Sequence, residues 1–79
     1  MTQTNSYKIR VKYSDATEFN QHLYSAGIGY RKQEIYFMET HLEAIDFYID
    51  VPEDEVLVMN LTFDITVEKL PKSPYQIHN

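Results

Sequence analysis

Polar and apolar side chains alternate strictly over residues 7–13. The apolar members share one side of an extended chain: Tyr7, Ile9, Val11 and Tyr13. The other side carries only cations: Lys8, Arg10 and Lys12. An alternation of period two among β-prone residues predicts a strand with one face in the core and one in water.

The segment after this strand has the spacing of a helix. Asp15 and Glu18 stand three residues apart, as in a capping box, where each side chain satisfies a backbone N–H of the first turn. Phe19 and Leu23 follow four residues apart and therefore share one helical face. Gly27 provides the residue that takes a positive φ just past a helix end. The pattern therefore predicts a strand followed by a helix.

A second strand is predicted over residues 33–38, and it could begin as early as Tyr30. Its apolar residues run consecutively instead of alternating, which is typical of a strand buried on both faces. The only two glycines, Gly27 and Gly29, lie in the short link before it.

Residues 40–51 are compatible with either a helix or a strand. Alternation over residues 45–51 suits a strand, whereas Thr40 and Glu43 have a second capping-box spacing. A helix would also gather four acidic side chains in one stripe: Glu39, Glu43, Asp46 and Asp50. We therefore favour the helix and keep the strand as the alternative.

The most regular alternation in the chain lies at residues 57–67, where every odd position is apolar. This pattern predicts one long strand, which we expect to be bent or bulged because of its length. A turn at residues 52–55, opened by Pro52, precedes it. Two prolines prevent the tail from continuing a sheet. We therefore expect residues 71–79, like residues 1–5, to be flexible.

These elements predict a small two-layer α+β domain over residues 6–70. The favoured order is β-α-β-α-β, with a sheet of about three strands and two helices. If residues 40–51 form a strand, the order becomes β-α-β-β-β with a helix on one face.

Composition narrows the classes of protein that remain. The 79 residues carry a net charge of −5 and contain no cysteine, so disulfides and thiolate metal sites are excluded. No apolar segment approaches the roughly 18 residues of a membrane span. After Met1 the first residues are polar and uncharged, so we expect no secretory signal. We expect a cytoplasmic protein without membrane contact.

The charge is unevenly distributed along the chain. Residues 1–32 contain five cations and two acids, whereas residues 33–68 contain ten acids and no Lys or Arg. Like charges at helical spacing repel, so a surface that keeps them is a candidate for partner binding. The predicted partner-binding residues are Glu39, Glu43, Asp46, Asp50, Glu53, Asp54 and Glu55. A simply solvated acidic face is the alternative, particularly if the cationic strand lies beside the acids and pairs with them.

The cations of the first strand suggest a second kind of binding. Together with the two cations after the glycines they form a candidate nucleic-acid surface: Lys8, Arg10, Lys12, Arg31 and Lys32. The alternation places the neighbouring tyrosines on the opposite, core side, which argues against base stacking. A pI near 5.0 also argues against a dedicated nucleic-acid binder.

Catalytic and metal chemistry find little support in the sequence. His41 stands between Glu39 and Glu43, but residues two apart on a helix do not converge on one ion. A domain of this size has little room for a cleft that excludes water and raises a carboxyl pKa. We therefore expect no enzymatic activity, no metal and no cofactor.

The sequence leads to one functional hypothesis and two alternatives. We expect a non-enzymatic protein-interaction module, such as a small acidic inhibitor or regulator, whose acidic face binds a basic surface of a larger partner. The alternatives are a nucleic-acid-binding module that uses the first strand and a homo-oligomerising structural protein, such as a homodimer paired through a sheet edge.

Overall fold

The computed structural model describes residues 3–71 as a four-stranded sheet with two helices. The elements follow one another along the chain as β1 (Asn5–Lys12), α1 (Tyr13–Ser25), β2 (Tyr30–Phe37), β3 (His41–Val51), α2 (Glu53–Thr62) and β4 (Ile65–Lys69). The predicted α+β class with two helices is confirmed, but the sheet has four strands instead of about three, in the order β-α-β-β-α-β.

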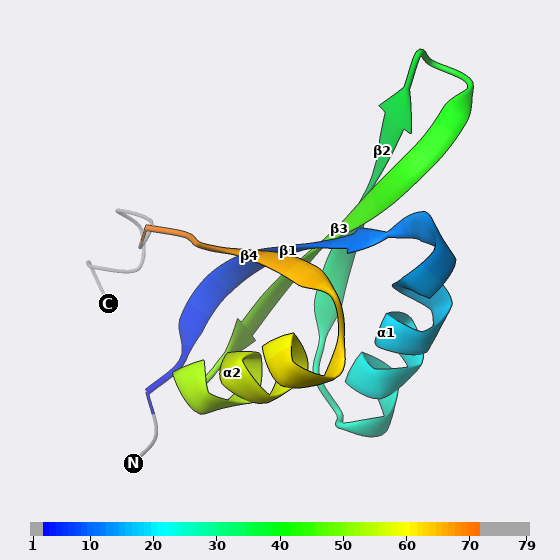
Figure 1. The fold of residues 1–79 in the computed structure, drawn as a ribbon. Helices are drawn as coiled ribbons and strands as arrows, with labels where there is room; N and C mark the ends of the chain where they lie inside the picture. Colours follow the sequence, from blue (N-terminus) through cyan, green and yellow to red (C-terminus); the bar gives the residue numbers. More distant parts are fainter. Residues whose placement is uncertain (1–2, 72–79) are drawn as a thin grey trace.

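All neighbouring strands are antiparallel, and their order across the sheet is β2-β3-β1-β4. This order, with two β-α-β units that interleave, is the ferredoxin-like or split β-α-β arrangement. Both helices lie on the same side of the sheet (Figure 1). Within residues 3–71 no helix covers the opposite side of the sheet, which we call the open face.

The core lies between the helices and the two central strands. Ile9 of β1 and Phe47 of β3 are directly opposite each other and fully buried. Phe19 of α1 packs on Phe47 with 5.0 Å between the ring centroids. The Phe19 ring also packs edge-on against Phe63, the residue that follows α2, with 5.2 Å between the ring centroids. These aromatic contacts join both helices to the sheet.

The favoured helix at residues 40–51 is wrong, and the alternative strand is correct. All of the segment except Thr40, which belongs to the preceding turn, lies in β3, and this strand pairs with β1 on one side and with β2 on the other. Its alternation buries Phe47, Ile49 and Val51 on the helix side. A helix would have left Phe47 off its apolar stripe, so burial of this ring outweighs the capping-box spacing of Thr40 and Glu43.

The predicted long strand at residues 57–67 is also wrong in its first half. Residues 53–62 form α2, and only the end of the predicted strand is extended, as β4. Pro52 immediately precedes the helix, and three acids occupy its first turn, where the helix dipole favours negative charge. Val56 and Met59, three residues apart, are the buried pair. The alternation did not indicate this pair because Val56 lies before the predicted strand, directly after the segment predicted as a turn.

The first helix and the second strand form where they were predicted, with differences in detail. Helix α1 begins at Tyr13, two residues before Asp15, and no side chain caps its first turn. Gly27 follows the helix with a φ of +72°, as expected. Strand β2 is an exposed edge of the sheet, not a strand buried on both faces.

Strands β2 and β3 extend beyond the body of the protein as a hairpin arm (Figure 1). Its turn contains Met38 and Glu39, both with positive φ angles of 56° and 65°. The register shifts between Ile35 and Tyr36, near the start of the arm. Among residues 3–71 no helix is long and apolar enough to cross a membrane. The predicted flexible tail lies, from residue 72 onward, outside the described residues.

The aromatic contacts predict which substitution destabilises the fold most. Phe47→Ala removes a fully buried ring that contacts Phe19 and Tyr30, and it should lower the free energy of unfolding by about 3–5 kcal/mol. Urea denaturation followed by circular dichroism measures this change. The control Leu61→Ala alters a side chain that is 89% exposed, and its effect should stay within about 0.5 kcal/mol. Equal effects of the two variants would contradict the assigned core.

Candidate functional site

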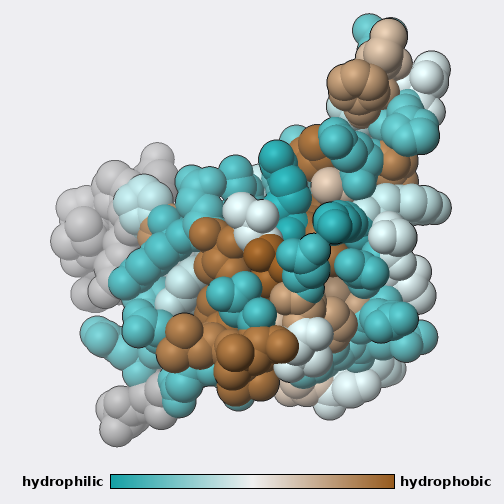
Figure 2. Space-filling view, viewed as in Figure 1, coloured by the Kyte–Doolittle hydropathy of each residue, from teal (hydrophilic) through white to brown (hydrophobic). Residues whose placement is uncertain are grey.

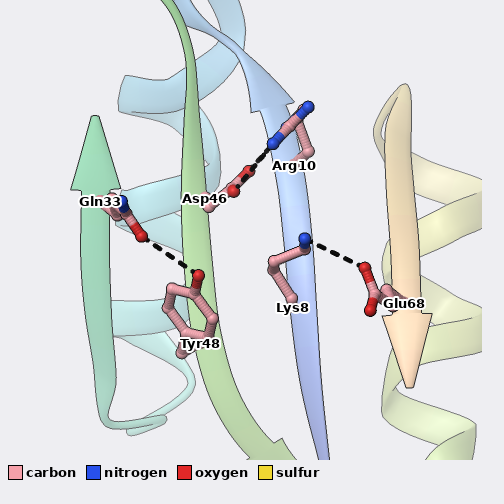
Figure 3. Close-up of polar contacts among 6 residues, drawn as sticks. All are labelled: Lys8, Arg10, Gln33, Asp46, Tyr48 and Glu68. Atoms are coloured by element: carbon pink, nitrogen blue, oxygen red, sulfur yellow. Dashed lines mark hydrogen bonds and ion pairs between the residues drawn. The ribbon is translucent and has the colours of Figure 1, made fainter. Parts of the chain in front are cut away.

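The open face of the sheet carries the cations of β1, and each has an acidic partner on a neighbouring strand or loop. Lys8 Nζ lies 3.0 Å from Glu68 Oε1 of β4. Lys12 Nζ lies 3.1 Å from Asp64 Oδ2, in the link before β4. Arg10 reaches to the other side, toward β3 (Figure 3). The position of β1 between two strands that carry acids therefore balances its charge within the fold.

The pair between Arg10 and Asp46 is the most constrained contact on this face. Arg10 Nε donates to Asp46 Oδ1 at 2.8 Å, and Nη2 donates to Oδ2 at 3.1 Å. Asp46 is only 2% exposed and is the one buried charged residue of the described chain. A two-point bond of this kind is stronger than a single ion pair because both carboxylate oxygens are satisfied.

Further hydrogen bonds extend this network along β3. Tyr48 Oη donates to Gln33 Oε1 of β2 at 3.2 Å (Figure 3). The Ser6 hydroxyl donates to Asp50 at the other end of β3. The central part of the open face is thus occupied by contacts within the protein itself.

The acidic partners raise the pKa of each β1 cation. For Lys8 the hydrogen bond with Glu68 is the main cause, followed by the charge of Glu68. Asp64 raises the pKa of Lys12 in the same way, and Asp46 raises that of Arg10. A raised pKa means that the stabilisation is present at neutral pH and is lost as the pH rises above the ordinary lysine value of 10.5.

The structure separates the predicted acidic face into three places. Glu39 lies in the turn of the hairpin arm, and Glu43 is exposed on β3. Asp46 and Asp50 are engaged on the open face, as described above. The remaining three acids form the first turn of α2: Glu53, Asp54 and Glu55. The predicted helical stripe does not form because residues 40–51 are a strand.

The five predicted nucleic-acid-binding cations are likewise not on one surface. Lys32 lies opposite Phe47 in the register, and directly opposed residues share a face, so Lys32 is on the helix side of the sheet. Arg31 is on the open side, where its guanidinium lies 5.6 Å from the centre of the Tyr48 ring. Strand β3, with Asp46, separates it from the cations of β1.

The two histidines within the described residues do not come together in one site. His22 packs edge-on against Phe63 at 5.5 Å, and His41 is exposed in the hairpin arm. His78 lies outside the described residues. Within residues 3–71 no three His, Asp or Glu side chains come close enough together to hold a metal ion.

A surface that the sequence did not indicate lies on α2. Three large apolar side chains of this helix are exposed: Leu61 at 89%, Leu57 at 57% and Val58 at 52%. Figure 2 shows an apolar patch in the lower centre of the view, over α2. A surface helix normally presents polar residues on its outer side, so this exposure is unusual.

Helical spacing brings these side chains together with one acid of the first turn. Leu57 and Val58 precede Leu61 by four and three residues, and Asp54 precedes Leu57 by three. Residues three and four apart are neighbours on a helix surface. The four residues therefore form one outward stripe, opposite the buried Val56 and Met59, which we call the α2 face: Asp54, Leu57, Val58 and Leu61.

No protein-family model matches this chain, and no curated protein matches it. The split β-α-β arrangement serves many unrelated functions, so it does not identify an activity. The function must therefore be argued from the surfaces of this chain alone.

The burial of Asp46 predicts unequal effects for two similar substitutions on β1. Arg10→Met leaves a buried carboxylate without its partner, and the free energy of unfolding should fall by about 1–3 kcal/mol. Lys8→Met removes a pair whose acid, Glu68, is exposed and keeps its contact with water, so stability should remain nearly unchanged. Urea denaturation at pH 7 compares them. If Lys8→Met were the more damaging of the two, the constraint assigned to Asp46 would be wrong.

Proposed function

We propose that this protein is a non-enzymatic protein-interaction module that binds its partner through the α2 face. The observation that carries the proposal is the exposure of Leu57, Val58 and Leu61 on a helix whose inner side is already apolar. Beyond its acidic first turn, α2 is apolar on two opposite sides, and a helix with apolar residues on both sides is normally covered on both. Here the core covers one side, and a partner would cover the other.

The free energy available from such covering supports binding. Burying an exposed leucine or valine side chain contributes about 1.5–3 kcal/mol. The two leucines and the valine are adjacent, so one partner surface can cover all of them together. Clusters of this kind, surrounded by polar groups, are typical of the centres of protein–protein interfaces.

The charge at the start of α2 supports a basic partner surface. Glu53, Asp54 and Glu55 are exposed, and none of them forms an ion pair with a residue in the described range 3–71. A partner with Lys or Arg beside an apolar patch would complement both parts of this surface. Of the seven acids predicted to bind a partner, this proposal therefore keeps the three in the first turn of α2.

A second copy of the chain is a poorer partner for the α2 face. Antiparallel packing of two such helices would place the acidic first turn of one beside the last turn of the other, which contains no basic residue and is the negative end of the helix dipole. Like charges at close range oppose that arrangement. A small acidic inhibitor or regulator of a larger protein is the form of interaction that fits this surface. The absence of enzymatic activity and a cytoplasmic location stay predictions.

The proposal predicts that substitutions on the outer side of α2 remove partner binding without unfolding the protein. The tagged full chain and its L57E/L61E variant serve as baits for capture from the native host, followed by mass spectrometry. A partner of the α2 face should be captured by the original chain and lost by at least about tenfold with the variant. The dissociation constant is then measured with the purified partner.

Two further variants control this experiment. Asn60→Asp changes an exposed residue on the flank of the same helix and should leave binding intact. Asp54→Lys should weaken binding, and increasingly so at low salt, because it reverses the charge beside the apolar stripe. A partner that binds L57E/L61E as tightly as the original chain would refute the proposal, and so would the capture of no specific partner.

A further inference from the structure

Strand β2 is the longer unpaired edge of the sheet. Among residues 3–71 it pairs with β3 only, and within that range its outer edge is open over eight residues, from Tyr30 to Phe37. The other edge strand, β4, has five residues and is followed closely by Pro71, which cannot donate a backbone hydrogen bond. An open edge offers a row of backbone N–H and C=O groups to another strand.

We propose that β2 pairs antiparallel with β2 of a second copy of this chain, with Gln33 opposite Gln33 on the two-fold axis. This proposal does not rest on the α2 face and concerns the opposite end of the sheet. The two sheets would join into one continuous sheet with all four helices on the same side.

The charges along β2 are complementary to themselves in this register. Lys32 of each copy faces Glu34 of the other, and the two-fold axis repeats the pair. The two residues belong to the same side of the sheet, since the register places them opposite Phe47 and Ile45. Tyr30 faces Tyr36 at each end of the paired segment. Opposite charges and aromatic pairs stabilise directly opposed positions of antiparallel strands.

The neighbouring registers are disfavoured by the same residues. A register that keeps the helices of both copies on one side shifts only in steps of two residues. One step in either direction places Lys32 opposite Lys32 or Glu34 opposite Glu34. Like charges in directly opposed positions are destabilising. The edge charges, which protect many sheet edges from association, here select one partner and one register.

Charge reversal tests the pairing through the mass of the protein in solution. Sedimentation equilibrium of the full chain at several concentrations should give a dimer. K32E and E34K should each raise the dimer dissociation constant by about tenfold or more, because each replaces two opposite-charge pairs by two like-charge pairs. R31E makes the same change of charge as K32E on the neighbouring residue. Its partner is Ile35, so it should dimerise nearly as well as the original chain.

The strongest support would come from restoring the pairs. An equal mixture of K32E and E34K places opposite charges across the axis again and should form a mixed dimer. The double variant K32E/E34K should form a dimer by itself. Recovery in both samples cannot arise from misfolding of the single variants. Failure of both to recover would overturn the assigned register.

A cysteine on the axis tests the register independently, since the chain contains no cysteine of its own. Directly opposed Cα atoms in antiparallel strands lie about 4.5–5.5 Å apart, within the range of a disulfide. Q33C should therefore cross-link to a dimer when oxidised with glutathione disulfide. R31C is the matched control, because its two copies would be separated by about four residues, roughly 13 Å along the strands.

Three results would overturn the proposal. The first is a monomer at every concentration up to about 1 mM, because a dimer with a dissociation constant above about 1 mM would be too weak to form at ordinary protein concentrations. The second is a dimer that persists unchanged in K32E and E34K, which would place the interface elsewhere. The third is equal cross-linking of Q33C and R31C. Loss of the dimer in L57E/L61E, but not in the charge variants, would assign the dimer to the α2 face instead.

Discussion

The antiparallel pairing of β1 with β3 is the constraint on which the rest of the structure depends. Its register places Ile9 opposite Phe47 on the helix side and Arg10 opposite Asp46 on the open side. A slip of one residue would turn Asp46 toward Phe19 and the core, and would expose the Phe47 ring to water. The hydrophobic contact and the two-point ion pair therefore select the same register from the two sides of the sheet. Both helices and both outer strands are positioned by this central pair.

The charged side chains in the middle of the open face are already paired with one another. We therefore assign binding to the two ends of the sheet. The cations of β1 and the acids beside them satisfy one another, so the open face offers few uncompensated charges. The groups without such partners lie beyond the central strands. At one end, α2 covers the β1–β4 side and turns Leu57 and Leu61 outward. At the other end, β2 presents an open backbone edge with Lys32 and Glu34 on it. Two copies joined at β2 would carry an α2 face at each far end, which suits bivalent binding.

The sequence predicts correctly those elements whose side-chain pattern is compatible with only one kind of secondary structure. The alternation over residues 7–13 identifies β1 and its cationic outer side, and the spacing of Phe19 and Leu23 identifies α1. Residues 40–51 and 57–67 each carry both a helical and an extended pattern, and tertiary packing decides between them. Burial of Phe47 requires a strand in the first segment, and burial of Met59 together with Val56, the residue just before the second segment, requires a helix there. The α2 face was not predicted because the exposure of Leu61 depends on which helix side meets the sheet. The sequence predicted ion pairs for the β1 cations only on the condition that β1 lies beside strands that carry acids. The structure meets this condition, because β1 pairs with β3 and β4.

The central claim is that a partner covers the outer side of α2 while the open sheet face stays as it is. Hydroxyl-radical footprinting, which labels exposed side chains, tests this claim directly on the free and the partner-bound protein. The account predicts that Leu57 and Leu61 lose their labelling in the complex, while Tyr48 on the open face and the exposed Tyr24 of α1 keep theirs. Protection of Tyr48 with undiminished labelling of Leu57 and Leu61 would contradict it.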